Sequence, residues 1–141
     1  MRFLAIILAL AAFVAPALCS TPAEGEQYSL VTLREARDLL GKPGVFFVDV
    51  NEAEVYERYH IPGATPVTSE DLRLFLPPDK QSVIVFYCAE RRCYASHAAA
   101  REAIKLGYRR VLVMPEGTFG WASAGLPIEK GAAPKAVQPG R

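Results

Sequence analysis

The chain has 141 residues, a formal net charge of +1 and a composition that is 51% hydrophobic. The apolar fraction excludes a disordered chain, and the near-neutral charge argues against a nucleic-acid-binding protein, which usually carries a strong basic excess. No internal repeat is visible.

Residues 1–20 have the pattern of a secretory signal peptide. A positive Arg2 precedes an unbroken apolar run over residues 3–14, and small residues then lead to candidate cleavage sites within 15–19. A membrane anchor is disfavoured because a spanning helix needs about 20 apolar residues. Lipid attachment at Cys19 is disfavoured because bulky Leu18 precedes it. We expect a periplasmic or secreted protein with no stable membrane span after cleavage, in which about 120 residues form one domain.

The first half of the remaining sequence predicts short strands and helices in alternation. After a polar segment (21–27), a strand is expected at 28–31. A capping box, Thr32 to Glu35, then starts a helix that Gly41 ends. The apolar run 45–50 is typical of a strand buried on both faces. The expected elements that follow are a short helix over 52–59 with Ala53 and Tyr56 inward, a turn at 60–64, a strand at 65–67 and a helical turn at 71–75.

The second half contains the strongest strand pattern. Residues 82–87 are continuously apolar after Ser82, and a six-residue segment from Cys88 to Cys93 leads from them into an Ala-rich helix over 94–106. A strand at 111–114 and a helix at 119–124 follow, and residues 130–141 are expected to form a flexible C-terminal tail.

Strands that alternate with helices predict an α/β fold with a parallel sheet and helices on both faces. Sites in such sheets lie at the carboxyl ends of the strands. Cys88 is the first residue after the strongest predicted strand. Its position therefore marks it as a candidate functional residue.

The segment that starts at Cys88 has features that activate a thiol. A thiolate is favoured near a helix N-terminus or beside Arg, and the following helix, Arg91 and Arg92 supply both, partly opposed by Glu90. A curled loop at a helix N-terminus can also hold an anion. The segment could therefore hold a thiolate, a persulfide or a bound oxyanion such as thiosulfate.

Other chemistries fit the spacing less well. A thioredoxin-like motif would have two residues between the cysteines, whereas four separate Cys88 from Cys93. A Cys-dependent phosphatase would have Arg six places after its Cys, where this chain has Tyr94. Two Cys with the distant His60 and His97 lack zinc-ligand spacing, so we expect no metal and no cofactor.

Two long segments carry a family resemblance. FFVDVNEAEVYERYHIPGATPV resembles the first signature of rhodanese domains, and VIVFYCAERRCYASHAAAREAIKLGYRRVLVMPEGTFGWASAGLPIE is similar to their second half. The resemblance covers residues 28–129. It implies a mostly parallel five-stranded sheet flanked by helices, and a sulfurtransferase whose loop Cys carries sulfane sulfur as a persulfide.

By this resemblance Cys88 would be the persulfide carrier, and backbone N–H groups of residues 89–93 would surround the outer sulfur. A small sulfur-containing anion or a thiol acceptor would be its substrate, with a periplasmic protein as a further possible partner. Asp49 and His60 would support the loop framework and the turn rather than perform acid–base chemistry. The predicted substrate-binding residues are Ala89, Glu90, Arg91, Arg92 and Tyr94.

Two positions depart from the family pattern. Asn51 stands where an Arg is common, which puts a supporting ion pair in doubt, and Cys93 ends the loop where Arg, Lys, Thr or Ser is frequent. The run 93–99 also resembles a secreted rhodanese-like branch that is named for a Cys-x-x-Cys-Trp motif and associated with PQQ-dependent catabolism. In this chain Tyr94 replaces the Trp of that motif.

The second thiol leaves three interpretations open. Cys93 could attack a persulfide on Cys88 and close a disulfide, which would make the pair catalytic and the protein a thiol–disulfide or persulfide redox protein. The pair could instead form a static disulfide, or Cys93 could be a bystander. The fold could also serve as a catalytically silent binding module, since fold alone does not determine function.

Overall fold

The computed structural model describes residues 28–132, so the predicted signal peptide, segment 21–27 and residues 133–141 of the predicted tail lie outside the described part. Its strands are β1 (Ser29–Leu30), β2 (Val45–Asp49), β3 (Thr65–Pro66), β4 (Val83–Tyr87) and β5 (Arg110–Val113). Its helices are α1 (Leu33–Leu39), α2 (Ala53–Arg58), α3 (Ala95–Lys105) and α4 (Gly117–Ser123), with a 3₁₀ turn η1 (Leu72–Leu74). Within this part of the chain, no helix has both the length and the apolar character that crossing a bilayer requires.

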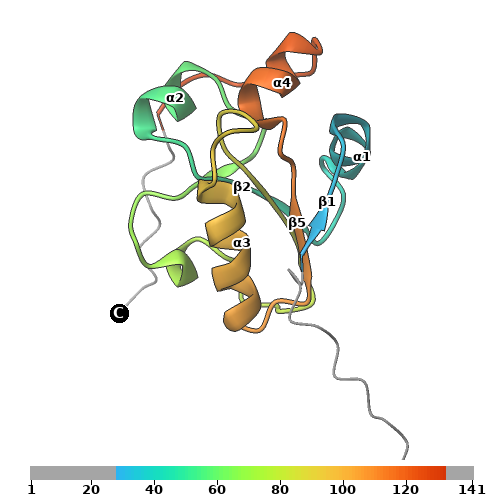
Figure 1. Cartoon of the computed structure of the whole chain (residues 1–141), viewed down its shortest axis with the longest axis vertical. Coiled ribbons are helices and arrows are strands. Elements are labelled where there is room, and N and C mark those ends of the chain that lie inside the picture. Colours follow the sequence, from blue (N-terminus) through green and yellow to red (C-terminus); the bar gives the residue numbers. More distant parts are fainter. Residues whose placement is uncertain (1–27, 133–141) are drawn as a thin grey trace, which may run out of the picture.

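The strands form one five-stranded parallel sheet in the order β1-β5-β4-β2-β3. Because every strand runs the same way, all the carboxyl ends lie at one edge of the sheet. Figure 1 shows α2, α4 and the loop between β4 and α3 together at this edge. The arrangement confirms the predicted α/β fold, with a sheet that is parallel throughout.

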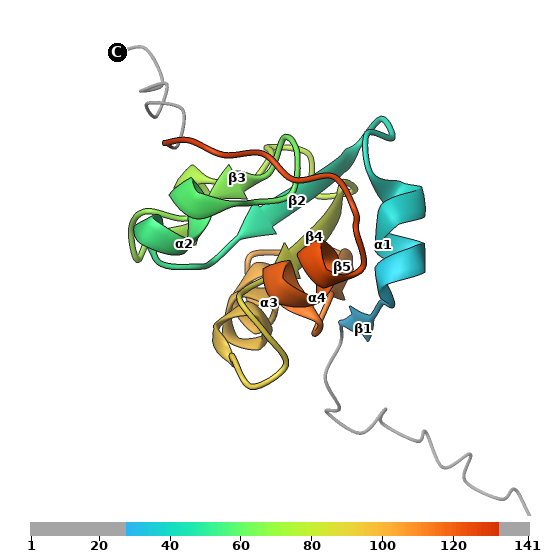
Figure 2. The same cartoon turned by 90° about the horizontal axis from the view of Figure 1, so that it is seen from above.

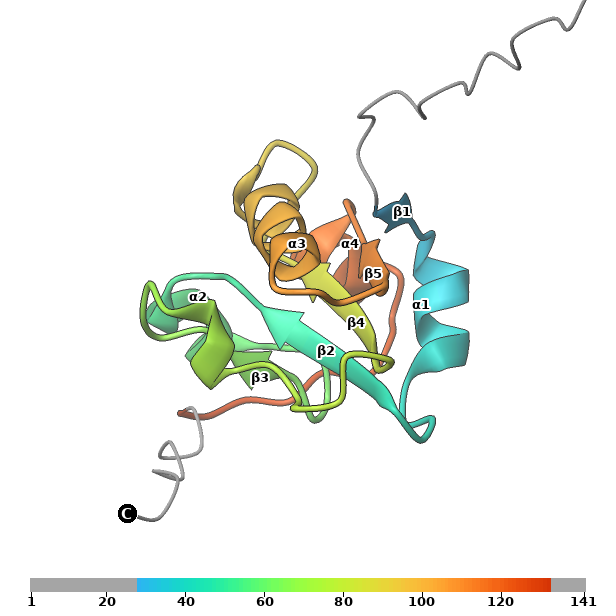
Figure 3. The ribbon, with the colours of Figure 1, turned by 90° about the horizontal axis from the view of Figure 1, so that it is seen from below.

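Helices cover both faces of the sheet. α3 and η1 lie on one face, where Ile84 and Phe86 are buried, and α1 and α4 lie on the other, where Val85, Tyr87 and Trp121 are buried. Figures 2 and 3 show α1 and α3 on opposite sides of β4 and β5. Every residue of β4 is buried because successive side chains point to opposite, equally covered faces.

Two expectations about burial were wrong in detail. β2 is buried on both faces only from Phe47 onward, and Phe46 is 38% exposed and belongs to neither buried cluster. In α2, Tyr56 is buried as predicted, but Ala53 is exposed. This helix is short and packs through Tyr56, so its first turn faces outward.

The predicted capping box of α1 is confirmed. The Glu35 backbone N–H donates to Thr32 Oγ1 over 3.3 Å, and the Thr32 N–H donates to Glu35 Oε2 over 2.8 Å. Two free N–H groups at the helix start are thereby satisfied by side chains from within the same turn.

Candidate active site

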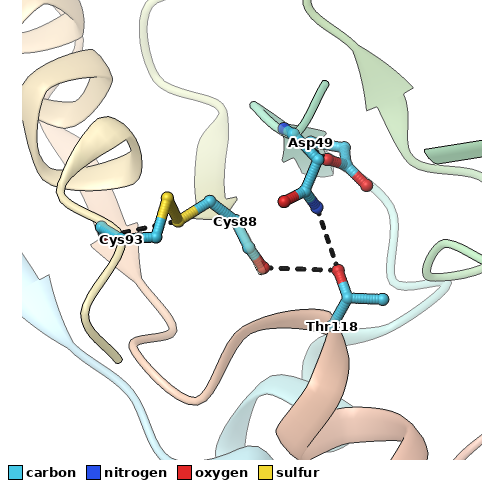
Figure 4. Close-up of a disulfide and its surroundings, with 5 residues drawn as sticks. Asp49, Cys88, Cys93 and Thr118 are labelled. Carbon is cyan, nitrogen blue, oxygen red and sulfur yellow. Dashed lines mark hydrogen bonds between the residues drawn. A yellow bond between two sulfur atoms is a disulfide. The ribbon is translucent and has the colours of Figure 1, made fainter. Parts of the chain in front are cut away.

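Cys88 follows β4 directly and is only 2% exposed. Its carbonyl oxygen accepts hydrogen bonds from the Thr118 backbone N–H at 2.8 Å and the Thr118 hydroxyl at 3.3 Å, and the Ala89 carbonyl accepts one from the Phe119 N–H at 3.0 Å. The first turn of α4 thus uses N–H groups that lack helical partners to hold the start of the loop. Figure 4 shows the link between Thr118 and Cys88.

Gly117 allows α4 to approach the loop this closely. Its φ of +64° lies in the left-handed region, and a Cβ at this position would lie 2.5 Å from the carbonyl carbon and oxygen of Ala89. Glycine is therefore the residue that fits at the start of α4.

Asn51 connects the end of β2 to the same loop. Its Nδ2 donates to Thr118 Oγ1 over 3.1 Å, and the Thr118 hydroxyl donates onward to the Cys88 carbonyl. The hydroxyl therefore uses its one proton toward Cys88 and accepts from Asn51. Where an Arg would bring a charge, Asn51 provides a neutral positioning contact.

Asp49 is the last residue of β2 and lies two positions before Asn51. It pairs with Tyr87 in the sheet register and is fully buried. Its Oδ1 accepts the Asn51 backbone N–H at 2.8 Å, whereas Oδ2 meets no donor with hydrogen-bond geometry among the described residues. Burial raises the pKa of Asp49 above its ordinary 3.8, and the Asn51 N–H and the nearby Tyr87 hydroxyl partly offset this effect. Burial and the Asp49 charge also raise the pKa of Tyr87.

The raised pKa of Asp49 predicts a component of stability that is lost as the pH rises. Between the unfolded and folded pKa values the folded protein binds more protons than the unfolded chain, so the free energy of unfolding falls with pH. This contribution is complete below the ordinary pKa of 3.8 and is lost as the pH passes the folded pKa. Asp49→Asn cannot ionise, so its urea unfolding from about pH 3 to about pH 7 should lack this component.

Comparing the wild type with Asp49→Asn separates the effect of Asp49 on the free energy of unfolding from the effects of the other carboxyl groups. The pKa values of Glu35 and Asp71 are lowered by hydrogen bonds to Thr32 and Arg73, so these groups give stability that is lost as the pH falls. They are present in both proteins and cancel in the difference. Equal pH dependence in the wild type and Asp49→Asn would contradict the prediction.

Cys88 and Cys93 form a disulfide whose Cα atoms are 6.3 Å apart. In this loop the Cys93 N–H donates to the Glu90 carbonyl over 2.9 Å, and the Cys93 carbonyl oxygen lies 3.2 Å from Cys88 Sγ. A disulfide sulfur has no proton to donate, so the second approach is not a hydrogen bond. Backbone N–H groups of residues 89–93 were predicted to surround the outer sulfur. In the disulfide state the Cys93 N–H does not do so, because it is bonded to the Glu90 carbonyl and the Cys93 carbonyl faces the Cys88 sulfur.

The charged loop residues lie at the surface. The Arg91 guanidinium pairs with the Glu116 carboxylate at the start of α4, while Glu90 and Arg92 are exposed. Tyr94 is 75% exposed, with its ring 6.1 Å from that of His97. As substrate-binding residues these side chains and the half-buried Ala89 stay predictions. For Arg91, binding an anion would compete with Glu116.

His60 has contacts that fit its predicted structural role. It is 6% exposed, stacks on the Tyr56 ring at 3.8 Å, and places Nδ1 2.7 Å from the Tyr56 carbonyl oxygen. Because a carbonyl only accepts, Nδ1 carries a proton. The His60 backbone also pairs with that of Glu129, which fastens the C-terminal segment beside α2.

A cleft of about 560 Å³ lies beside the site, at the carboxyl ends of β2 and β3. Asn51 and Ala53 line it together with residues 52, 56–57 and 66–70, whereas neither cysteine does. Across residues 28–132, no group of three or more His, Cys, Asp or Glu side chains is placed to hold a metal ion.

Three residues at the start of α4 were not assigned to the site from the sequence, namely Glu116, Gly117 and Thr118. Each contacts the loop, through the Arg91 ion pair, the close backbone approach and the hydrogen bonds to the Cys88 carbonyl. The available signal was the Glu-Gly-x-x-x-Trp run, in which the glycine indicates a close backbone approach.

Comparison with known proteins agrees with this architecture. The chain is 26% identical over 105 residues to the thiosulfate sulfurtransferase GlpE of Actinobacillus pleuropneumoniae, covering 74% of this chain and 95% of GlpE. A thiosulfate sulfurtransferase structure from Pseudomonas aeruginosa superposes with a TM-score of 0.65 and 28% identity, over 81% of this chain and 22% of that one.

An HTH-type transcriptional regulator of Mycobacterium tuberculosis is 38% identical over 91 residues, which are 62% of this chain and only 39% of the regulator. The chain thus spans about two fifths of that relative's length. The Rhodanese-like domain family matches residues 32–124, about two thirds of the chain. The chain therefore belongs to the rhodanese-like domain family.

Proposed function

We propose that this protein is an extracytoplasmic sulfurtransferase that carries sulfane sulfur as a persulfide on Cys88. The observation that carries the proposal is the position of Cys88, at the carboxyl end of the fully buried β4, with its carbonyl held by Thr118 and its loop leading into α3. The similarity to thiosulfate sulfurtransferases supports the same reaction class. Residues 1–20 are the basis for the location.

The reaction requires Cys88 in its reduced form. Its thiolate attacks the outer sulfur of thiosulfate, forms the Cys88 persulfide and releases sulfite. A thiol or cyanide then takes the outer sulfur and returns the Cys88 thiolate. α3 has no side-chain cap, so N–H groups of its first turn favour negative charge nearby.

Intact mass measured after reduction, removal of the reductant and incubation with thiosulfate tests this proposal. We expect a gain of one sulfur that cyanide removes. The cyanide step is needed because a sulfinic acid adds nearly the same mass. No gain in mass on the reduced protein would contradict the proposal and favour a binding module. The same spectrum of protein recovered from a periplasmic extract tests the loss of the signal peptide.

A second candidate function is reduction of the persulfide to sulfide, and the Cys88–Cys93 disulfide specifically favours it. In this step the Cys93 thiol attacks the inner sulfur of the Cys88 persulfide. The Cys88–Cys93 bond forms, the outer S–S bond breaks, and the outer sulfur leaves as hydrosulfide. Two electrons pass from the thiols to the sulfane sulfur, so each turnover ends in the disulfide.

Cys93→Ser should trap the persulfide on Cys88. Sulfide release from thiosulfate in the presence of a dithiol reductant should fall at least about tenfold, since the variant loses an attacking group held at high effective concentration. The persulfide should accumulate, as measured by the cyanide-removable gain in mass. Unchanged sulfide release would show that Cys93 takes no part and would leave the first function alone.

A further inference from the structure

The two sulfur atoms of the disulfide belong to residues that differ in their access to solvent. Cys88 is 2% exposed and lies at the end of β4, where α4 holds its carbonyl. Cys93 is only partly buried and lies between exposed Arg92 and Tyr94. Figure 4 shows the disulfide extending from the end of β4 toward the start of α3.

This difference decides which sulfur an incoming thiol can attack. The thiolate must approach along the S–S axis, from the side opposite the leaving sulfur, and access to each sulfur governs the rate. While the disulfide is closed, Cys88 is buried at the end of β4 and Cys93 belongs to the partly exposed end of the loop, so an incoming thiol reaches Cys93 more readily. The exposed Arg92 guanidinium also favours a negatively charged nucleophile there.

Attack at Cys93 releases Cys88 as the leaving group without moving it away. The Cys88 backbone is fixed by Thr118, and the Cys93 carbonyl, 3.2 Å from Cys88 Sγ, can accept the proton of a free thiol. Cys88 therefore stays beside the new mixed disulfide. It can attack Cys93 Sγ again and expel a monothiol, so a monothiol reduces the bond inefficiently.

We propose that the Cys88–Cys93 disulfide is reopened at Cys93 by a protein that carries a dithiol. The first thiolate of the partner forms a mixed disulfide with Cys93 and releases Cys88. The second thiol of the partner then attacks the partner sulfur that is bonded to Cys93. This step releases the Cys93 thiol and leaves the partner as a disulfide. Two electrons and two protons pass to the cysteine pair. The inference rests on the proposed function in its persulfide-reducing form, because that step makes the disulfide in each turnover.

The chain offers a direct way to map the attack. Trypsin cleaves after Arg91 and Arg92, so Cys88 and Cys93 fall on different peptides. The oxidised protein is mixed briefly with glutathione, and separately with a thioredoxin that lacks its second active-site cysteine, and free thiols are blocked with N-ethylmaleimide. We expect the adduct on Cys93 and the maleimide on Cys88, at least about tenfold over the reverse pattern.

Two controls make the outcome decisive. In guanidinium chloride the fold no longer shields Cys88, so the thiol adduct should form on Cys88 and Cys93 in about equal amounts. Native thioredoxin should reduce the bond faster than glutathione at equal thiol concentration. A thiol adduct on Cys88 in the native protein, equal amounts of thiol adduct on both cysteines, or no adduct with either thiol would overturn the proposal.

The mapping is independent of sulfur loading, so the two proposals fail separately. An adduct on Cys93 without sulfur gain from thiosulfate would support reduction by a dithiol protein and contradict the sulfurtransferase function. Sulfur gain on the reduced protein together with an adduct on Cys88 would support the sulfurtransferase function and contradict reduction by attack at Cys93.

Discussion

Cys88→Ser is expected to reduce sulfur loading from thiosulfate by at least about a thousandfold, to below detection. The serine hydroxyl is not ionised near neutral pH, and only an anionic nucleophile attacks the outer sulfur of thiosulfate efficiently. The side chain lies at the end of β4 with its backbone held by Thr118, whereas Cys93, the other thiol of the loop, has its Cα 6.3 Å away at the far end of the loop. The cyanide-removable gain in intact mass measures the effect.

Cys93→Ser is the matched control for this variant. Both substitutions remove the same disulfide, whose cysteines are 5 positions apart. In the chain-entropy account each loses about 2 kcal/mol of stability from the opened loop. Loss of loading in Cys88→Ser alone would therefore reflect chemistry rather than stability. Full loading in Cys88→Ser would refute the persulfide on Cys88, and equal loss in both variants would assign the defect to the loop conformation.

The parts of the fold that the sequence predicted depend on local patterns. The apolar runs that became β2 and β4 identified two central strands, and the Thr32–Glu35 capping box marked the start of α1. The outward position of Ala53 was not predictable in this way, because the packing of a short helix depends on which distant residues cover it. Phe46 shows the same limit, since its exposure depends on which distant segments cover the start of β2.

The candidate site, like the fold, was predictable from the sequence only where it depends on local patterns. The position of Cys88 at the end of a buried strand was readable, because carboxyl ends of parallel strands meet at one edge. The Asn51–Thr118 hydrogen bond joins residues 67 positions apart, and the Arg91–Glu116 pair joins residues 25 apart. No local pattern predicts such contacts. They arise because the ends of β2 and β4 and the start of α4 meet in space.

Gly117→Ala is expected to destabilise the protein by about 3 kcal/mol or more. The new Cβ would lie 2.5 Å from the Ala89 carbonyl atoms and closer still to the Cys88 carbonyl oxygen, and the atoms that must move are backbone. A residue with a side chain also adopts a φ of +64° at a cost of about 1 kcal/mol. Thermal unfolding should show a fall in Tm of roughly 10 °C or more.

Gly125→Ala separates the two causes of this loss. Gly125 has a similar φ of +69°, but a Cβ there meets nothing within 4 Å, so its substitution should cost only the backbone term of about 1 kcal/mol. The difference between the variants then measures the close approach of α4 to the loop. Where Gly117→Ala still folds, α4 must withdraw from the Cys88 carbonyl, and sulfur loading should fall while Gly125→Ala retains it. Equal destabilisation by the two substitutions would mean that the Cys88–Ala89 backbone moves away from the new Cβ at little cost in free energy. In that case α4 would not fix the position of Cys88.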